Sequence, residues 1–467
     1  MDRPTIPGSA ELDAFRRRFG VVLERTSEIA TERTILLQDP LLKTDVAHLW
    51  DTPPTNQRNP RPAADIGAYR AWEKCKCVTA DLEVIQAYYD LLKMPPPGFR
   101  EAGPREFLHF DPASVNVGIV TAGGIAPGLN MVVHALVSRH RFYGTKRIYG
   151  FRNGFRGFYG TIGHDDPVLL DDDNTRNWIH RGGTLLGTLR EDGADIPAVV
   201  DRLQRMDIKI LYVVGGNGSL SAAHEISKEV GRRKLGIAVA GVPKTMDNDV
   251  RWVWQSFGFT TAVEEATRVI NILHEEAQAN NRICVVRLFG RNSGFVAANA
   301  VLASGEVDAV LIPEENPIDL EVVLEHIGRV LSSEGHAVIV VAEGVGKDGG
   351  LTPQALFSEL RSRFKDVLPG RYGAFENEPR HQIRAVPAGP ADQTYCRRLS
   401  DLAVDNALAG FTDFMISCWL TEYVLVPLEL VAGRTKQVPT GGIFWKEVRN
   451  STRQPSFRRE SAPLPSN

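Results

Sequence analysis

The chain has 467 residues and a formal net charge of −3. Hydrophobic residues make up 43% of it and charged residues 24%, which is typical of globular proteins, and the length predicts two or three domains. The balanced charge excludes the basic excess of most duplex-DNA-binding proteins, and five cysteines do not make a disulfide scaffold. The first residues show no apolar signal segment, and no stretch has the roughly 18–20 apolar residues of a membrane span. We therefore expect a cytoplasmic protein that binds neither membranes nor nucleic acid.

Residues 1–113 differ in composition from the rest of the chain. Polar, proline-rich stretches such as 51–62 (DTPPTNQRNPRP) alternate there with the helical patterns 64–72 and 81–92. We interpret this part as an extension that wraps the core or mediates assembly, with a disordered linker only at 51–62. The polar tail from Arg449 is expected to fray.

From residue 115, short runs of Val, Ile and Leu alternate with amphipathic segments. Such runs are typical of parallel strands that helices cover on both faces, so we predict a doubly wound α/β architecture. The predicted strands cover 115–121, 208–214, 235–241, 282–288, 308–312 and 336–341, and the predicted helices cover 129–138, 219–230, 293–303 and 320–331. In such sheets ligands bind beyond the carboxyl ends of the strands, so the loops at those ends are the candidate site.

Two glycine-rich loops follow predicted strands and precede predicted helices. They are 123–128 (GGIAPG) and 215–219 (GGNGS). Glycine lets backbone N–H groups approach a phosphate, and a helix N-terminus adds positive potential there. A plain tight turn in the first loop, and a helix cap formed by Ser219 in the second, are the simpler explanations. Two such loops in one sheet favour a cradle for a polyphosphate.

A third loop, 243–249 (PKTMDND), carries the candidate catalytic groups. Asp247 and Asp249 lie two residues apart and close to Lys244. One carboxylate suits a base that takes a proton from a hydroxyl, and the other suits a ligand of Mg²⁺. Taken alone, the loop is more simply explained as a turn rich in Asp and Asn. The two phosphate-type loops in the same sheet favour the chemical interpretation.

These loops belong to a longer series of motifs, with which the chain resembles the phosphofructokinase family, and in particular its long ATP-dependent forms from plants and trypanosomatids. The motifs are TAGGIAPGLN (121–130), GGTLLGTLR (182–190), GGNGS (215–219), GVPKTMDND (241–249), SFGFTTAVEEA (256–266), FGRNSGF (289–295) and AEGVG (342–346). The resemblance covers residues 115 to 430, in the family's order and spacing. It implies two Rossmann-like doubly wound domains with the active site between them, and Mg²⁺-dependent phosphoryl transfer to the 1-hydroxyl of a ketose phosphate. The domains expected on this basis are an N-terminal extension (1–113), a donor-phosphate domain (114–252), a sugar-phosphate domain (253–435) and a C-terminal tail (436–467).

The resemblance also implies roles for residues on the donor side. Asp247 matches the catalytic base, and Asp249 matches the aspartate that supports metal and substrate. Arg190 and Thr245 match residues that contact the transferring phosphoryl group, whose charge a guanidinium stabilises. The expected donor-binding residues are Gly124, Gly216, Asn217, Gly218, Ser219 and Lys244, and the expected Mg²⁺ ligands are Asn217 and Asp249.

On the acceptor side, the resemblance implies the substrate-binding residues Arg282, Phe289, Gly290, Arg291, Glu343, His381 and Arg384. Glu343 matches the carboxylate that binds sugar hydroxyls, and Arg291 matches an arginine near the sugar and the transferred phosphate. His381 and Arg384 stand as H-x-x-R, like the family's pair on the distal phosphate. Arg282 matches a bacterial-type arginine that reaches a neighbouring subunit's substrate, which predicts a homo-oligomer, a dimer or tetramer, with active sites near the subunit interfaces. A surface charge for Arg282 and an ordinary loop histidine for His381 are the simpler alternatives.

Three positions depart from the family's pattern. Asn217 replaces an aspartate that helps to hold Mg²⁺, so metal binding should weaken. Phe289 replaces a methionine and should reshape the sugar pocket. Phe375 replaces a basic residue of the phosphate site, which Arg380 restores only from a different register. These departures leave the acceptor open between fructose 6-phosphate and another phosphorylated small molecule.

The donor and the activity also have alternatives. Gly218 favours ATP, because pyrophosphate users commonly carry a bulky acid there that blocks the nucleotide, whereas Lys244 is shared by both kinds of enzyme. A non-catalytic paralogue that binds sugar phosphate or nucleotide is the second hypothesis; Asn217 and Phe375 motivate it, and the intact Asp247 opposes it. A dehydrogenase that uses NAD is disfavoured, because the loop after the first predicted strand, 123–128 (GGIAPG), is not a G-x-G-x-x-G motif.

Overall fold

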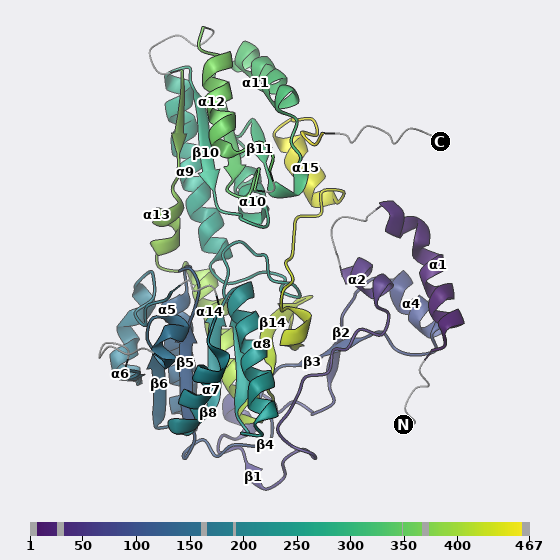
Figure 1. Cartoon of the computed structure of the whole chain (residues 1–467), viewed down its shortest axis with the longest axis vertical. Helices are drawn as coiled ribbons and strands as arrows, with labels where there is room; N and C mark the ends of the chain where they lie inside the picture. Colours follow the sequence, from purple (N-terminus) through teal and green to yellow (C-terminus); the bar gives the residue numbers. More distant parts are fainter. Residues whose placement is uncertain are drawn as a thin grey trace. The chain divides into compact units, whose positions relative to one another are not determined.

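The computed structural model describes residues 7–25, 32–159, 166–189, 193–347, 349–366 and 373–459. The chain divides into two compact α/β units. Unit 1 consists of Met1–Thr245, Val250–Gly258 and Ala385–Thr435, and unit 2 of Met246–Asp249, Phe259–Arg384 and Lys436–Asn467. Helices and strands alternate along most of both units (Figure 1), which confirms the predicted α/β fold class.

Unit 1 is built around a sheet that, within the described residues, has nine strands in the order β2-β3-β15-β14-β9-β8-β5-β6-β7. The strands are β2 (Cys75–Cys77), β3 (Gly98–Glu101), β5 (Asn116–Thr121), β6 (Arg147–Phe151), β7 (Val168–Leu169), β8 (Ile208–Gly215), β9 (Ala238–Pro243), β14 (Phe414–Trp419) and β15 (Glu422–Pro427). The central strands from β14 to β6 are parallel, and the strands at both edges are antiparallel. The carboxyl ends of β5, β8 and β9 therefore lie at the same edge of the sheet.

The helices of unit 1 cover both faces of this sheet. Alternate residues of β8 enter two different cores: Ile210 and Tyr212 face α5 and α14, while Leu211 and Val213 face α7 and α8. This alternation is the signature of a parallel strand buried on both faces. The helices of the unit are α1 (Ser9–Arg25), α2 (Glu32–Gln38), α3 (Ala63–Ile66), α4 (Leu82–Leu91), α5 (Leu129–Tyr143), α6 (Asp172–Thr175), α7 (Ile196–Arg205), α8 (Asn217–Arg232) and α14 (Pro390–Leu408).

The N-terminal segment belongs to unit 1, whose main sheet it extends. Its strands β2 and β3 continue the main sheet through pairing with β15, and β1 (Gln57–Arg58) pairs with β4 (Phe107–Leu108). Helix α4 confirms the predicted helix at 81–92, whereas the pattern at 64–72 gives only the short α3, because Gly67 interrupts it with φ +86°.

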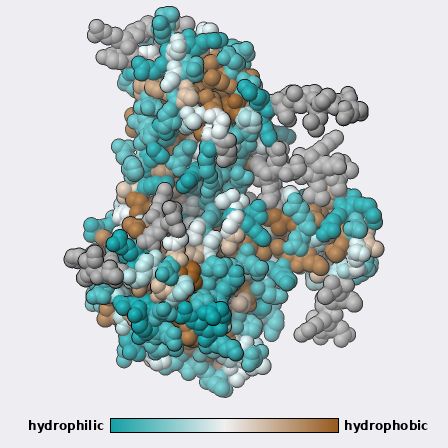
Figure 2. Space-filling view, viewed as in Figure 1, coloured by the Kyte–Doolittle hydropathy of each residue, from teal (hydrophilic) through white to brown (hydrophobic). Residues whose placement is uncertain are grey.

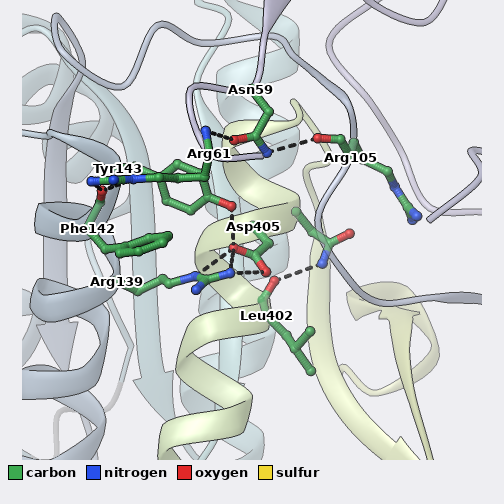
Figure 3. Close-up of polar contacts among 9 residues, drawn as sticks. Asn59, Arg61, Arg105, Arg139, Phe142, Tyr143, Leu402 and Asp405 are labelled. Carbon is green, nitrogen blue, oxygen red and sulfur yellow. Dashed lines mark hydrogen bonds and ion pairs between the residues drawn. The ribbon is translucent and has the colours of Figure 1, made fainter. Parts of the chain in front are cut away.

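The stretch 51–62, predicted as a possible linker, is held by hydrogen bonds in the structure. Arg61 donates from its guanidinium to the carbonyl oxygen of Phe142 on α5, and Asn59 donates to the carbonyl of Arg105 at 3.0 Å. Figure 3 shows these contacts beside the buried pair of Arg139 and Asp405, which joins α5 to α14. The linker interpretation is therefore wrong for this stretch, since its polar side chains bond to a folded core.

Unit 2 contains, among the described residues, a parallel sheet of four strands in the order β11-β12-β10-β13. The strands are β10 (Ile283–Leu288), β11 (Ala309–Leu311), β12 (Ala337–Ala342) and β13 (Ala374–Asn377). The helices are α9 (Phe259–Ala279), α10 (Phe295–Ser304), α11 (Leu320–Glu334), α12 (Pro353–Arg363), α13 (Arg380–Ala385) and α15 (Ile443–Ser451). Strands β10 and β12 are buried at every position; β12 is apolar throughout, and β10 is apolar except for Arg287.

The expected boundary at 252/253 falls inside unit 1, whereas the expected boundary at 435/436 coincides with a boundary between the units. Residues 385–435 belong to unit 1, because α14 packs against α5 and β14 pairs with β9. Residues 436–459 belong to unit 2: α15 packs against α10, and Gln454 exchanges hydrogen bonds of 2.7 and 3.0 Å with the backbone of Val310. The expectation of a frayed tail from Arg449 is therefore wrong as far as residue 459, and residues 460–467 lie outside the described part.

The surface agrees with the balanced composition. The face in Figure 2 is mostly hydrophilic, and the large apolar side chains that are exposed include Leu82 and Tyr89 on α4. All five cysteines are free thiols. Among the described residues, no helix has the length and apolar character needed to cross a membrane.

Candidate active site

The first glycine-rich loop joins β5 to α5 in unit 1. Gly123 adopts φ +83° and Gly128 φ +100°, and a Cβ at Gly128 would lie 2.7 Å from the sulfur of Cys396. Gly128 also precedes the first residue of α5, so that the loop leads directly into the helix N-terminus. Backbone N–H groups at such a place attract phosphate, because the first turn of a helix leaves its donors unpaired within the helix.

The second glycine-rich loop leads from β8 into α8. Gly216 is the capping position and Asn217 the first residue of the helix, so Ser219 lies inside the first turn and is not its cap. The hydroxyl of Ser221 donates to the carbonyl of Asn217 at 2.9 Å and accepts from the N–H of Gly433 at 3.1 Å. This turn is thus fixed to another loop of unit 1, and the potential at its helix N-terminus favours an anion.

Lys244, the first residue after β9, connects the two glycine-rich loops. Its backbone N–H donates to the carbonyl of Gly215 at 2.9 Å, and its ammonium donates to the carbonyl of Gly124. The side chain is only 5% exposed. The structure therefore brings Gly124, Gly216 and Lys244 together at the carboxyl ends of three adjacent parallel strands, as predicted, and adds a cation to the helix N-termini.

Arg190 lies outside the described residues. The chain that leads to it runs along the first loop: the N–H of Gly123 donates to the carbonyl of Leu189 at 3.3 Å, and the hydroxyl of Thr188 donates to the carbonyl of Gly123 at 2.6 Å. Thr245, the other residue predicted to contact the transferring group, is half-buried, and its carbonyl accepts from the hydroxyl of Ser256. The roles of both residues stay predictions.

The pair of aspartates lies where the chain enters unit 2. The carbonyl of Asp247 accepts from the hydroxyl of Ser293 at 2.9 Å, and the carbonyl of Asp249 accepts from the N–H of Lys436 at 2.7 Å. Between them Asn248 has φ +53°, and its side-chain oxygen accepts from the Lys436 ammonium at 3.0 Å. The segment is therefore fixed on both sides by unit 2.

Sequence reasoning missed Lys436 and Ser293. Burial lowers the pKa of the Lys436 ammonium to about 7, and the charge of Asp249 opposes this shift. Lys436 also lies with its ammonium 5.1 Å from the ring centroid of Phe295. No local pattern reveals such a residue, because it lies 187 positions from Asp249 in a segment without periodicity. Ser293 lies inside the FGRNSGF motif, and this position is the one sequence feature that marks it as a candidate site residue.

The acceptor-side loops of unit 2 follow β10 and β12. Phe289 is 1% exposed, and Gly290 has φ +123°, with its carbonyl accepting from the N–H of Gly344 at 3.0 Å. This contact places Glu343, the residue before Gly344, beside the FGR motif. Arg291 is exposed. The structure thus brings Phe289, Gly290, Arg291 and Glu343 together at the carboxyl end of this sheet.

Helix α13 supplies three further polar side chains. Arg380 forms an ion pair with Glu343, with 2.8 Å between Nη1 and Oε2, and a second with Glu378 at 2.8 Å. His381 is exposed, and Arg384 lies with its guanidinium carbon 4.3 Å from the ring centroid of Phe289. Arg380, considered from sequence only as a replacement from another register, therefore contacts the carboxylate that is predicted to bind the sugar.

Arg282 stands apart from the other acceptor-side residues of its own chain. It directly precedes β10, whereas Phe289 directly follows it, so the strand separates them by about 3.3 Å per residue over six residues. Its guanidinium lies 4.3 Å from the ring centroid of Phe375 on β13 and 3.4 Å from Glu276. Within one chain, Arg282 does not join Glu343 and Arg384.

The donor atoms present fit Mg²⁺ better than a softer metal. The residues predicted to hold it offer oxygen atoms, a carboxylate from Asp249 and an amide carbonyl from Asn217, and hard Mg²⁺ prefers such ligands. Asp249 is 6% exposed, so its carboxylate is largely shielded from solvent. Among the described residues, no cluster of three or more His, Cys, Asp or Glu side chains forms a complete protein-only metal site.

Comparison with known proteins identifies the family. The family model described as phosphofructokinase matches residues 116–407. ATP-dependent 6-phosphofructokinase 1 of Arabidopsis thaliana is 38% identical over 451 residues, which cover 91% of this chain and 93% of that protein. The ATP-dependent 6-phosphofructokinase of Amycolatopsis methanolica is 39% identical, over 80% of this chain and 87% of its own.

Solved structures agree in fold. The pyrophosphate-dependent phosphofructokinases of Marinobacter aquaeolei and Nitrosospira multiformis superpose with TM-scores of 0.63 and 0.64 over 76% of this chain. The matched parts cover 94% and 95% of those chains, at 21% and 20% identity. At this identity the likeness concerns the fold alone, and the sequence matches carry the assignment. The chain belongs to the phosphofructokinase family, a family of kinases.

Proposed function

We propose that the protein transfers the terminal phosphoryl group of ATP to the 1-hydroxyl of fructose 6-phosphate or of a closely related sugar phosphate. The observation that carries this proposal is the position of Lys244, whose backbone and ammonium join both glycine-rich loops just before the DND segment. A polyphosphate donor needs such a cluster of amides and cations, and a hydroxyl acceptor needs the carboxylate that follows three residues later.

In the proposed reaction, Asp247 takes the proton of the acceptor's hydroxyl as its oxygen attacks the donor's terminal phosphorus. The amides of the two glycine-rich loops and Lys244 hold the donor phosphates. Arg190 and Thr245 contact the transferring group, whose negative charge a guanidinium balances in the transition state. The hydrogen bond from Ser293 to the Asp247 carbonyl fixes the backbone of the base, which limits the motion of its carboxylate.

The acceptor is held by groups of unit 2. Glu343 accepts hydrogen bonds from sugar hydroxyls, and Arg291 contacts the sugar and the transferred phosphate. His381 and Arg384 bind the phosphate that the acceptor already carries. Arg380, through its ion pair with Glu343, fixes the orientation of that carboxylate. Such fixed groups favour a phosphorylated sugar over an unphosphorylated one.

Mg²⁺ fits the reaction through Asp249, with Asn217 as a weaker oxygen ligand. When bound, the ion neutralises charge on the donor phosphates and orients them for transfer. The chain's own contribution is the fixed backbone at Asp249, which the N–H of Lys436 holds at 2.7 Å.

ATP is the proposed donor and pyrophosphate the alternative. A Cβ built at Gly218 meets no atom within 4 Å, so the space beside this residue is open. An acidic side chain there would fill that space, and its absence leaves room for a nucleotide. The relatives at 38–39% identity named above are called ATP-dependent, which supports the same choice.

The proposal includes a homo-oligomer, a dimer or tetramer, that acts in the cytoplasm. Arg282 supports the oligomer, because β10 separates it from the acceptor-side groups of its own chain. A guanidinium in that place can serve the acceptor phosphate only of a neighbouring subunit. Light scattering of the full chain, with and without fructose 6-phosphate, measures the assembly.

The experiment that tests the activity is an acceptor panel. ADP release is followed with ATP and Mg²⁺, and phosphate release with pyrophosphate and Mg²⁺, for fructose 6-phosphate and other ketose and aldose phosphates. We expect turnover with ATP and a ketose phosphate. Binding of sugar phosphate without turnover of either donor across the panel would contradict the proposal and support the non-catalytic paralogue.

A further inference from the structure

Two arginines of unit 2 lie on the faces of phenylalanine rings. The guanidinium carbon of Arg282 is 4.3 Å from the ring centroid of Phe375, and that of Arg384 is 4.3 Å from the ring centroid of Phe289. Both distances lie well inside the limit of about 6 Å for a cation–π contact. These two rings stand at two of the positions where the sequence departs from the family's pattern.

The backbone fixes the first of these pairs. Phe375 lies on β13 directly opposite Cys284 of β10, the second residue after Arg282. The N–H of Arg282 donates to the carbonyl of Ala277 at 2.9 Å, which closes the end of α9 onto the strand. Glu276 lies 3.4 Å from the guanidinium, whose side chain is 20% exposed. The cation therefore has a ring on its face and an exposed carboxylate at one edge.

The second pair sits at the other end of β10. Phe289 is 1% exposed and directly follows the strand, so its ring is held by the packed core. Arg384 lies in the last turn of α13 and is half-buried. A methionine at position 289 would offer a flexible thioether in place of a rigid π face. The ring gives this arginine a fixed support that a methionine does not.

We infer that Phe289 and Phe375 are positioning residues that hold Arg384 and Arg282 in the orientation that binds an acceptor's phosphate, Arg384 in its own subunit and Arg282 in the neighbouring subunit of the proposed oligomer. The inference rests on the proposed function and adds to it the way in which the phosphate site is built. A stacked guanidinium uses its face for the ring and keeps its N–H groups in the plane for a phosphate. Phe375 thus stands where the family has a second basic residue, and in place of that charge its ring orders the guanidinium of Arg282.

This arrangement predicts that the rings affect acceptor binding and not the chemical step. An arginine held in one orientation loses less rotamer freedom when a phosphate binds, which strengthens binding without changing the chemical step. Removing the ring therefore weakens acceptor binding and leaves the donor site and the transfer step unchanged. A purely structural role for the rings would lower the amount of active enzyme, and so kcat, instead.

The test compares leucine and aromatic variants of the full chain in steady-state kinetics. For Phe375→Leu and Phe289→Leu we expect KM for fructose 6-phosphate to rise about three- to thirtyfold, the range of a cation–π contact, with kcat and KM for ATP unchanged. Phe375→Tyr keeps a π face and should keep the KM of the natural chain. Because Phe289 is fully buried, Phe289→Met serves as a second, volume-conserving variant with the same expected effect.

Phe357→Leu is the matched control. Arg361 lies 5.8 Å from the ring centroid of Phe357 on α12, so this pair has the same chemistry outside the candidate site. Its removal should change KM for fructose 6-phosphate by less than about twofold. An unchanged KM in both site variants, or an equal rise in the control, would overturn the inference.

Calorimetric titration separates this inference from the proposed function. Fructose 6-phosphate and inorganic phosphate are titrated into each folded variant without a donor. If the natural chain binds fructose 6-phosphate but turns over no donor, the proposed reaction fails. Weaker binding by the leucine and methionine variants would still show that the two rings position the arginines. Equal dissociation constants in all variants would overturn the inference whether or not the protein is an active kinase.

Discussion

The ammonium of Lys244 donates a hydrogen bond to the carbonyl oxygen of Gly124, 120 residues away in the chain. The contact joins the loop after β9 to the loop after β5, and the backbone of Lys244 also bonds to Gly215 after β8. One lysine thereby fixes three loops at one edge of a parallel sheet. Its charge also lies where the amides of two helix N-termini attract an anion.

Replacing Lys244 with methionine should impair the donor side selectively. The variant loses a charge-assisted hydrogen bond and a cation, so we expect kcat/KM for ATP to fall about 10- to 100-fold. Lys228→Met on the exposed part of α8 is the control, since that ammonium pairs only with Glu225 in the described structure. Steady-state kinetics with varied ATP measures both. Equal kinetics in the two variants would remove Lys244 from the donor site.

Arg139 and Asp405 form a buried ion pair in unit 1, and removing either partner alone should destabilise the unit. The guanidinium donates to the carboxylate at 2.8 and 2.9 Å, and Asp405 also accepts from the hydroxyl of Tyr143 at 2.9 Å (Figure 3). Burial raises the pKa of the Asp405 carboxyl, and the Arg139 guanidinium opposes that rise. Arg139→Met or Asp405→Leu alone should cost about 3–5 kcal/mol of unfolding free energy, because each leaves the other partner unpaired.

The double variant Arg139→Met/Asp405→Leu is the informative comparison. It leaves no uncompensated charge, so it should be less destabilised than the sum of the two single variants. Urea unfolding followed by circular dichroism measures the coupling. Strict additivity would mean that the two charges do not depend on each other.

Glu314 should make the stability of unit 2 depend on pH. Burial raises the pKa of its carboxyl to about 7, although the N–H groups of Gly294 and Val438 donate to Oε1 at 2.9 and 2.8 Å and oppose the shift. In the described structure its Oε2 has no hydrogen-bond partner, which fits a protonated oxygen. The folded chain therefore binds this proton more tightly than the unfolded chain. The resulting stability is complete below the unfolded pKa of 4.5 and is lost as pH rises through 7.

Glu314→Gln keeps the acceptor oxygen and removes the titration. Relative to this variant, the natural chain should lose about 1–3 kcal/mol of unfolding free energy between pH 5 and pH 8. Thermal melts across this range measure the difference, with Glu321→Gln on the exposed face of α11 as the control. A difference that does not change with pH would contradict the raised pKa.

Deleting residues 1–113 should destroy the fold rather than only the assembly. The deletion removes β2 and β3 from the main sheet and exposes Trp252, whose ring packs at 5.3 Å from that of Phe99. We expect an aggregating product without a cooperative melting transition. A soluble, cooperatively folded product of smaller size in light scattering would restore the interpretation of this segment as an assembly extension.

The sequence predicted the parts of the site that follow a local rule. Glycine-rich loops after apolar strands lie at the carboxyl edge of a parallel sheet, and the structure has the loops at 123–128 and 215–219 there; the contact of Lys244 with Gly124 was not predicted. The predicted strands at 115–121 and 208–214 differ from the observed Asn116–Thr121 and Ile208–Gly215 by a single residue at an end, because strands that are buried on both faces are rich in apolar residues.

Other parts depend on contacts between distant segments that no local pattern reveals. Residues 385–435 return to unit 1 because β14 pairs with β9, and nothing in either strand's own sequence specifies its neighbour. Lys436 reaches Asn248 from a segment without periodicity. The contacts of Phe375 with Arg282 and of Phe289 with Arg384 join residues 93 and 95 positions apart, so no local pattern reveals them.

The central claim is that this chain transfers phosphoryl groups with Asp247 as the base. The most direct test is a phosphorus NMR time course of the natural chain and of Asp247→Asn, with Mg²⁺, fructose 6-phosphate and either ATP or pyrophosphate. We predict a new phosphomonoester resonance with ATP, and a rate in the Asn variant lower by about 10²- to 10⁴-fold, the contribution of a general base. No new resonance with either donor, or an undiminished rate in Asp247→Asn, would contradict the account.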